Sequence, residues 1–212
     1  MQALVTGFEP FGGDRVNPSF EALKRLPAGL GGLAIATCSL PVVYGEALSV
    51  LRRALAHAAP DIVLCTGLAG GRAELSLERV AINIDDARMP DNAGNQPIDQ
   101  PVIAGAPAAY FATLPIKAAV AALREAGLPA AVSNSAGTFL CNHVFFGLMH
   151  EAAKARLFRG GFLHVPYLPS QAAQERAAPS MALEQVVEGI EIILSVVAAR
   201  VDDIEVSEGA VS

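Results

Sequence analysis

Three side chains of the sequence have the types that a cysteine hydrolase needs. Cys141 supplies a nucleophile, His164 a base for its proton, and Glu78 a carboxylate that can orient the base. Cys141 follows a Ser- and Gly-rich stretch and opens a run of apolar residues with helical spacing. In the first turn of a helix, unpaired backbone N–H groups and the helix dipole favour a thiolate over a thiol. The pattern therefore predicts a reactive thiol at position 141.

The base has rivals in the sequence. His143 and His150 lie on the same predicted helix as Cys141, and His143 is only two positions away, so its side chain points to a different face. His164 lies in an apolar run, where a histidine is more often a core residue whose hydrogen bonds are satisfied. Spacing alone leaves the choice of base open.

The carboxylate is equally open, because Glu74 and Asp85 could take the place of Glu78. A buried, inert Cys141 is the structural alternative to a nucleophile, and Cys38 and Cys65 are expected to be core residues. No closely spaced His and Cys set has the intervals of a metal site, so no metal is expected. The residues are compatible with a cysteine hydrolase but do not establish one.

Strands and helices are predicted to alternate along the chain. Apolar runs predict strands at residues 3–6, 33–40, 61–66, 130–132 and 161–166, with an extended segment at 75–83. Helices are predicted at about 17–26, 43–58, 115–127, 140–159 and 181–199. This alternation predicts an α/β fold, a three-layer α/β/α sandwich around a mixed, mostly parallel twisted sheet. Ligand sites in such sheets lie outside the carboxyl ends of the strands, where the candidate residues can meet.

The connections carry further signals. Residues 7–13 form a Gly-rich loop without a Walker or dinucleotide fingerprint. Residues 85–97 form a polar excursion that is long for a connecting loop, and long ordered loops are often functional. Ser135 or Thr138 is expected to cap the Cys141 helix, and glycines 160 and 161 to close it. No linker divides residues 1–212, so a single domain is expected, with a frayed acidic tail at about 202–212.

Composition narrows the class of protein. The 212 residues are 52% hydrophobic and 17% charged, which is typical of a compact fold with a large core. The net charge of -6 disfavours nucleic acid as a partner, and no apolar run is long enough to cross a membrane. Three cysteines are too few for a disulfide scaffold, and no leader is recognisable. We therefore expect a cytoplasmic protein with reduced thiols.

Five longer motifs occur in order from the N-terminus to the last predicted strand. They are Thr6-Gly7-Phe8-Glu9-Pro10-Phe11-Gly12-Gly13, Glu78-Arg79-Val80-Ala81-Ile82-Asn83, Arg88-Met89-Pro90-Asp91-Asn92-Ala93-Gly94, Ser133-Asn134-Ser135-Ala136-Gly137-Thr138-Phe139-Leu140-Cys141-Asn142 and His164-Val165-Pro166. With shorter matches at residues 17–19, 70–72 and 96–97, they resemble the cysteine-type pyroglutamyl peptidase (pyrrolidone-carboxylate peptidase) family. The resemblance implies an exopeptidase that removes an N-terminal pyroglutamyl residue from peptides through a thioester, without a cofactor.

The resemblance also implies roles for individual residues. It implies a triad in which Cys141 is the nucleophile, His164 its base and Glu78 the third member. On the substrate side it implies four residues, Phe8 and Phe11 around the ring, Asn17 nearby and Arg88 close to the nucleophile. The sequence departs from the family at Leu68, where members often carry Gln.

The sequence also leads to expectations about the oligomeric state, and it leaves two alternative functions open. The resemblance implies a homo-oligomer, a dimer or tetramer. A nucleoside phosphorylase-like enzyme is one alternative, suggested by similar layering and a Gly-rich first loop. A catalytically silent binding protein of the same fold is the other.

Overall fold

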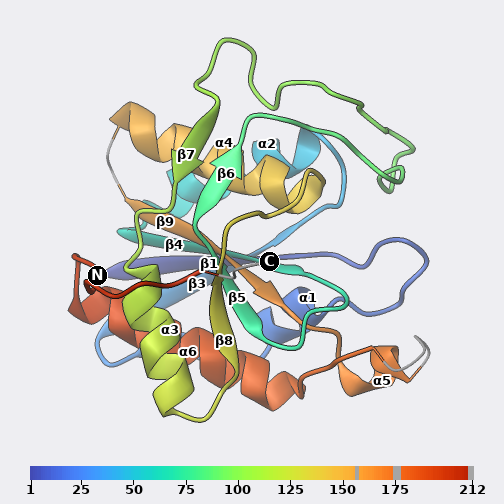
Figure 1. The fold of residues 1–212 in the computed structure, drawn as a ribbon. Coiled ribbons are helices and arrows are strands. Elements are labelled where there is room, and N and C mark those ends of the chain that lie inside the picture. The colour runs from blue at the N-terminus through green and yellow to red at the C-terminus, as the bar shows by residue number, and fades with distance from the viewer. Residues whose placement is uncertain (156–157, 174–177, 210–212) are drawn as a thin grey trace.

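A seven-stranded sheet forms the centre of the molecule, with strand order β2-β3-β1-β4-β9-β5-β8 (Figure 1). The computed structural model describes residues 1–155, 158–173 and 178–209. The strands of this sheet are β1 (Gln2–Phe8), β2 (Gly29–Leu30), β3 (Leu33–Leu40), β4 (Ile62–Leu68), β5 (Leu75–Glu78), β8 (Ala130–Ser133) and β9 (Arg159–Val165). The pairs β1–β3, β1–β4, β4–β9 and β5–β8 are parallel, whereas β2–β3 and β5–β9 are antiparallel. The predicted mixed, mostly parallel sheet is therefore confirmed.

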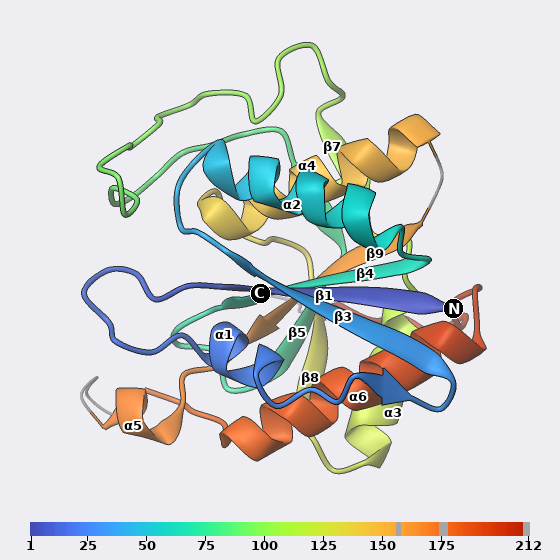
Figure 2. The ribbon, with the colours of Figure 1, turned by 180° about the vertical axis from the view of Figure 1, so that it is seen from behind.

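Helices cover both faces of the sheet (Figures 1 and 2). One face carries α2 (Glu46–Ala58) and α4 (Leu140–Ala155), and the other carries α1 (Pro18–Leu23), α3 (Ile116–Glu125), α5 (Pro169–Ala172) and α6 (Leu183–Ala199). A separate two-stranded ribbon, β6 (Val80–Ile82) with β7 (Ala109–Phe111), packs against α4. One layer of helices therefore covers each face of the sheet, and the prediction of a three-layer fold is confirmed.

Alternating side chains of the central strands fill two separate cores. In β4, Ile62 and Leu64 point into the core beneath α1, α3 and α6, whereas Val63 and Cys65 point into the core beneath α2 and α4. All four residues are fully buried, as expected for a central strand covered on both faces. This alternation decides which face of the sheet each functional side chain of a strand reaches.

Several predicted boundaries were wrong. The predicted extended segment at residues 75–83 divides at Arg79 into β5 and β6, which belong to different sheets. Strand β9 begins at Arg159, so Gly160 and Gly161 lie in the sheet and do not close α4. The prediction also missed β2, β7 and α5, which are too short to give a periodic signal. Helix α5 ends at Ala172, and residues 174–177 lie outside the described part.

The acidic tail is not frayed where the structure describes it. Asp203 caps helix α3, because its two carboxylate oxygens accept hydrogen bonds from the backbone N–H groups of Lys117 and Ala118 at 3.0 and 2.8 Å. Glu208 forms an ion pair with Arg124, and its carbonyl oxygen accepts a hydrogen bond from Arg79. The tail is ordered because it supplies the side-chain cap that Pro115, at the N-cap of α3, cannot provide. Residues 210–212 of the predicted frayed tail lie outside the described part.

Replacing Asp203 with Ala should lower the free energy of unfolding by about 0.5–2 kcal/mol, the usual value of a lost cap. Asp202→Ala is the matched control, because its carboxylate makes no hydrogen bond within the described residues. Denaturant titration of both variants measures the difference. Equal midpoints for Asp203→Ala and the unchanged protein would show that the tail does not stabilise α3.

Candidate active site

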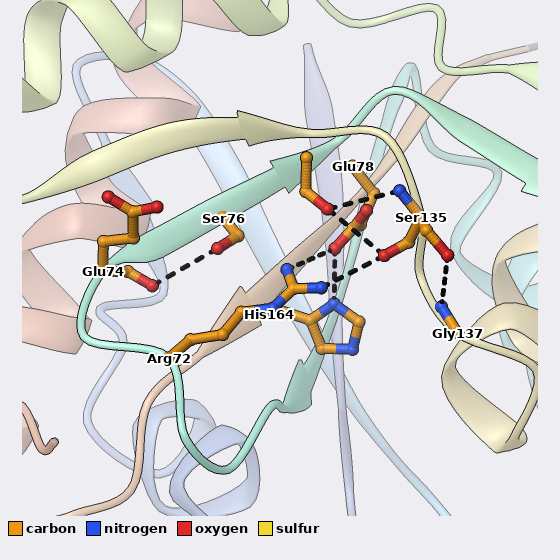
Figure 3. Close-up of polar contacts among 8 residues, drawn as sticks. Arg72, Glu74, Ser76, Glu78, Ser135, Gly137 and His164 are labelled. Atoms are coloured by element: carbon orange, nitrogen blue, oxygen red, sulfur yellow. Dashed lines mark hydrogen bonds and ion pairs between the residues drawn. The ribbon is translucent and has the colours of Figure 1, made fainter. Parts of the chain in front are cut away.

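The register of β5 against β9 brings Glu78 and His164 together. Ser76 lies opposite His164 in this antiparallel pair, and Glu78, two residues further on, points to the same face of the sheet as Ser76. Diagonal neighbours on one face are within reach of long side chains. His164 Nδ1 accordingly lies 2.7 Å from Glu78 Oε1 (Figure 3). Glu78 is fully buried and His164 is 4% exposed, so the pair is shielded from water.

Cys141 reaches the same place from helix α4, where it is the second residue. Gly67 on β4 is the register partner of His164, and a Cβ atom at Gly67 would lie only 2.8 Å from the Cys141 sulfur. Only glycine leaves room there for the thiol to pack over the sheet. Cys141 and His164 line one cavity. The structure therefore brings the three residues of the expected triad together from three elements.

The loop before α4 does not cap the helix as predicted. Ser135 Oγ accepts a hydrogen bond from the N–H of Gly137, and Thr138 Oγ1 donates to the carbonyl oxygen of Asp86. Both hydroxyls thus shape the loop and its neighbour. The first N–H groups of α4 have no partner within the helix and lie beside Cys141, where they can stabilise negative charge.

The resting protonation of the pair differs from the prediction. Burial of the Cys141 thiol, with the charge of Glu78 nearby, raises its pKa to about 12. Burial also lowers the pKa of His164, and the hydrogen bond and charge of Glu78 offset only part of that effect. Loss of hydration at Cys141 outweighs the ~0.3–1 kcal/mol by which a helix dipole favours the thiolate, so the pKa of the thiol is raised and not lowered. At neutral pH the site therefore holds a thiol beside a neutral imidazole.

Each rival base is occupied elsewhere. His143 Nδ1 lies 2.8 Å from Asp85 Oδ2, and its Nε2 accepts a hydrogen bond from the N–H of Gly45 at 3.4 Å. His150 pairs with the hydroxyl of Tyr110 at 2.9 Å. None of these residues lines the cavity that contains Cys141. The geometry favours His164 as the base.

The cavity beside Cys141 has a volume of 390 Å³ and a mainly apolar wall. All four residues implied on the substrate side contribute to it, namely Phe8, Phe11, Asn17 and Arg88. Leu68 lines it too. Arg88 is exposed, and none of the described residues forms a hydrogen bond or ion pair with its guanidinium, which leaves the group available to a bound carbonyl oxygen.

The aromatic residues of the wall are not equivalent. Phe8 is 3% exposed and packs in the core beneath α2 and α4, so it supports the fold as well as the cavity. Phe11 is half-buried, and its ring centroid lies 6.3 Å from that of Phe139, a third ring of the wall. Asn17 caps α1 by accepting from the N–H of Ser19, and its side-chain amide donates to the carbonyl of Glu9. Asn17 thereby fixes the loop that presents Phe11.

Asn142 and Arg72, which had no role predicted from the sequence, make contacts that hold the site together. Asn142 is fully buried, and its side-chain amide donates to the carbonyls of Ile82 and Ile84 while its oxygen accepts from the N–H of Ile82. It thereby fastens the segment leading to Arg88 onto the first turn of α4. Arg72, on the turn after β4, pairs with Glu78 and lines the cavity. Both stand inside motifs that carry the resemblance, but only the fold shows their partners.

Metal ligation is not suggested by this arrangement. Among the described residues, no group of three or more His, Cys, Asp or Glu side chains is placed to hold a metal ion. The polar groups around Cys141 instead have the arrangement of a nucleophile, a base and a group that orients the base.

Known proteins resemble this chain over nearly its whole length. A sequence profile described as pyroglutamyl peptidase matches residues 1–200. A pyrrolidone-carboxylate peptidase of Erwinia tasmaniensis is 54% identical over 210 residues, covering 99% of this chain and 98% of that protein. Pyrrolidone-carboxylate peptidase 1 of Ralstonia nicotianae is 56% identical over 208 residues, 97% of each. The crystal structure of pyroglutamyl peptidase I from Bacillus amyloliquefaciens superposes with a TM-score of 0.95 at 47% identity, over 97% of this chain and 99% of that one.

Alkylation tests the protonation state of the site. Iodoacetamide should modify Cys141 before Cys38 and Cys65, because only Cys141 combines a helix start with a base, His164, in the same cavity. Its rate should rise from about pH 6 to about pH 9, since thiolate forms more readily as the pH approaches the thiol pKa of about 12. Peptide mapping after brief labelling gives the rate at each thiol. His164→Ala should slow labelling at Cys141 alone; a rate that is already constant at about pH 5 would reveal a standing thiolate and contradict this picture.

Proposed function

We propose that Cys141, His164 and Glu78 carry out the reaction of this chain, which belongs to the pyroglutamyl peptidase family. The chain is a cysteine hydrolase that removes an N-terminal pyroglutamyl residue from peptides. The observation that supports the triad most strongly is the buried bond between His164 and Glu78 beside the cavity that Cys141 lines. Membership of this family favours a peptidase over the alternative of a nucleoside phosphorylase-like enzyme.

The reaction begins with a neutral pair. The Cys141 sulfur attacks the pyroglutamyl carbonyl carbon while its proton passes to His164 Nε2, since Nδ1 donates to Glu78. The carboxylate of Glu78 stabilises the imidazolium that forms. N–H groups at the start of α4, together with Arg88, hold the oxyanion, and each such donor typically contributes ~3–4 kcal/mol to transition-state stability.

Attack of the sulfur gives a tetrahedral intermediate. This intermediate breaks down to a thioester, which water then hydrolyses. The carbon–nitrogen bond breaks, and His164 gives its proton to the departing amine, which leaves a thioester on Cys141. His164 next takes a proton from water, whose oxygen attacks the thioester carbon. Pyroglutamate departs, and the proton returns to the sulfur. No cofactor takes part in this proposal.

Specificity for pyroglutamate follows from its neutrality. The lactam has one ring N–H and one ring carbonyl, so it can be buried against apolar faces once these two groups find partners. A free N-terminal glutamate would bring an ammonium and a carboxylate into the same apolar cavity, and an unpaired buried charge costs several kcal/mol. Phe11 and Phe139 provide apolar surface at the wall, and Leu68 adds to it.

We propose a single peptidase domain that assembles into a homo-oligomer and works in the cytoplasm. Exposed Phe111 and Ile98 offer apolar surface for a contact between copies, and the three cysteines are all free thiols. No described helix is both long enough and apolar enough to cross a membrane. Light scattering at micromolar concentration tests the assembly, and the mass of a single chain would overturn it.

Release of a chromogenic amine from a pyroglutamyl conjugate tests the function itself. The protein should release the amine, and iodoacetamide should abolish the release. An inert protein with an intact Cys141 thiol would support the alternative of a silent binding protein.

Substitution separates the members of the triad. Cys141→Ala and His164→Ala should each lower turnover by on the order of 10⁶-fold, and Glu78→Gln by on the order of 10⁴-fold, because orienting groups usually matter less than the nucleophile or base. Glu74→Gln is the matched control, since its carboxylate makes no hydrogen bond within the described residues. Initial rates with the chromogenic conjugate measure all four. Unchanged turnover in Glu78→Gln would transfer the third role to another residue.

The two phenylalanines should respond differently to truncation. Phe11→Ala should raise KM about tenfold, a loss of ~1.4 kcal/mol of binding, while thermal stability stays close to that of the unchanged enzyme. Phe8→Ala should lower the free energy of unfolding by about 3–5 kcal/mol, because Phe8 is buried in the core. Steady-state kinetics and thermal melts distinguish the two effects. If Phe11→Ala leaves KM unchanged, Phe11 does not contact the substrate ring.

A further inference from the structure

Arg72 joins two parts of the site that come from distant segments. Its Nη1 atom lies 2.8 Å from Glu78 Oε1, and its Nη2 donates to the carbonyl oxygen of Ser135 at 3.1 Å (Figure 3). Glu78 orients His164, and Ser135 belongs to the loop that delivers Cys141. One planar guanidinium thus spans the carboxylate and the loop, which two single-donor groups could not hold in a fixed relation.

The carboxylate needs this partner. Glu78 is fully buried, and a buried carboxylate is stable only when it is paired and hydrogen-bonded. Oε1 accepts from both His164 and Arg72, whereas Oε2 has no hydrogen-bond partner among the described residues. The imidazole is neutral at rest, so it cannot balance the charge. Arg72 is the cation that does so, from a position 32% exposed at the cavity wall.

We propose that Arg72 is a positioning residue of the reaction, which holds Glu78 as the acceptor for His164 and fixes the Ser135 loop in the geometry that presents Cys141. This proposal rests on the proposed function. It assigns Arg72 no contact with substrate: its effect passes through Glu78 and the loop. The rate of the chemical step, rather than substrate binding, should therefore depend on it.

Arg72 also affects the pKa of His164. The charged and titratable groups around His164 are Glu78 from β5, Cys141 from α4 and Arg72, with Asp86 and Arg88 at the cavity wall. The positive charge of Arg72 opposes protonation of His164, whereas Glu78 favours it. Removing Arg72 leaves the charge of Glu78 unopposed, so the pKa of His164 should rise. Because the base must be neutral, the acid limb of kcat/KM should move to higher pH.

Two substitutions separate charge from geometry. Arg72→Gln removes the charge, and we expect kcat to fall on the order of a hundredfold with KM little changed, and the acid limb to move to higher pH. Arg72→Lys keeps the charge but has one ammonium for two acceptors, so kcat should fall while the acid limb stays near its original position. Arg52→Gln is the matched control, because it breaks an ion pair with Glu151 on the α2 and α4 face, away from the cavity. That variant should keep the original kcat and pH profile.

Kinetics of the unchanged enzyme on the chromogenic conjugate come first, because an inactive parent protein would contradict the proposed function and not the role of Arg72. Unchanged kcat in Arg72→Gln, or a raised KM at constant kcat, would overturn the positioning role, the latter by making Arg72 a substrate contact. The Nδ1 proton resonance of His164 gives a readout independent of turnover: it should shift in Arg72→Gln and not in Arg52→Gln. If Arg72→Gln fails to fold, Arg72→Lys decides, and original kcat in that variant overturns the proposal.

Discussion

The antiparallel register between β5 and β9 is the constraint on which the rest of the site depends. It places Glu78 and His164 on one face of the sheet, diagonal to one another, in the layer beneath α4. Slipping the register by one residue would turn every side chain of β5 to the opposite face, and Glu78 would enter the core beneath α3 and α6. The parallel pairing of β9 with β4 then sets His164 beside Gly67, over which the Cys141 sulfur lies. Two pairings of one strand thus assemble a site from three segments.

Burial has opposite consequences for the members of the site. It protects the Glu78–His164 hydrogen bond from water, yet it also raises the pKa of Cys141 and lowers that of His164. The resting site is therefore neutral at sulfur and imidazole, and charge separates only as the sulfur attacks. In the proposed mechanism, the N–H groups at the start of α4 contribute most as the sulfur attacks, because negative charge then reaches the carbonyl oxygen beside them. Arg72 forms an ion pair with Glu78, whose carboxylate is fully buried beside His164.

Much of the fold could be predicted from the sequence, because the signals were long and periodic. The run at residues 33–40 became β3 without any change of boundary, and the apolar run at 61–66 became the central strand β4. The reversal of β5 could not be predicted, since a four-residue strand carries no sign of its direction. The ordered tail was missed for a similar reason: Asp203 is an ordinary acidic residue until the fold brings the start of α3 to it.

In the candidate site, too, some features could be predicted from the sequence and others depend on contacts that only the fold creates. The types of Cys141, His164 and Glu78 indicated their chemistry, and the resemblance chose them over rivals such as His143. The structure supports the same choice, because both ring nitrogens of His143 are engaged, one with Asp85 and the other with the N–H of Gly45. The place of Cys141 in the first turn of a helix suggested a stabilised thiolate, but the hydration that the thiol loses depends on what the fold packs around it. Similarly, Arg72 shows a role only once Glu78 and Ser135 are known to flank it.

The central claim is that Cys141 carries the pyroglutamyl group during the reaction. Rapid acid quenching of the enzyme with a pyroglutamyl substrate, followed by digestion and mass spectrometry, tests this claim directly. We expect one 5-oxoprolyl group on the peptide that contains Cys141, absent from Cys141→Ala and increased when an ester substrate makes acylation faster than hydrolysis. The same group on a peptide that lacks Cys141, or full turnover by Cys141→Ala, would contradict the account.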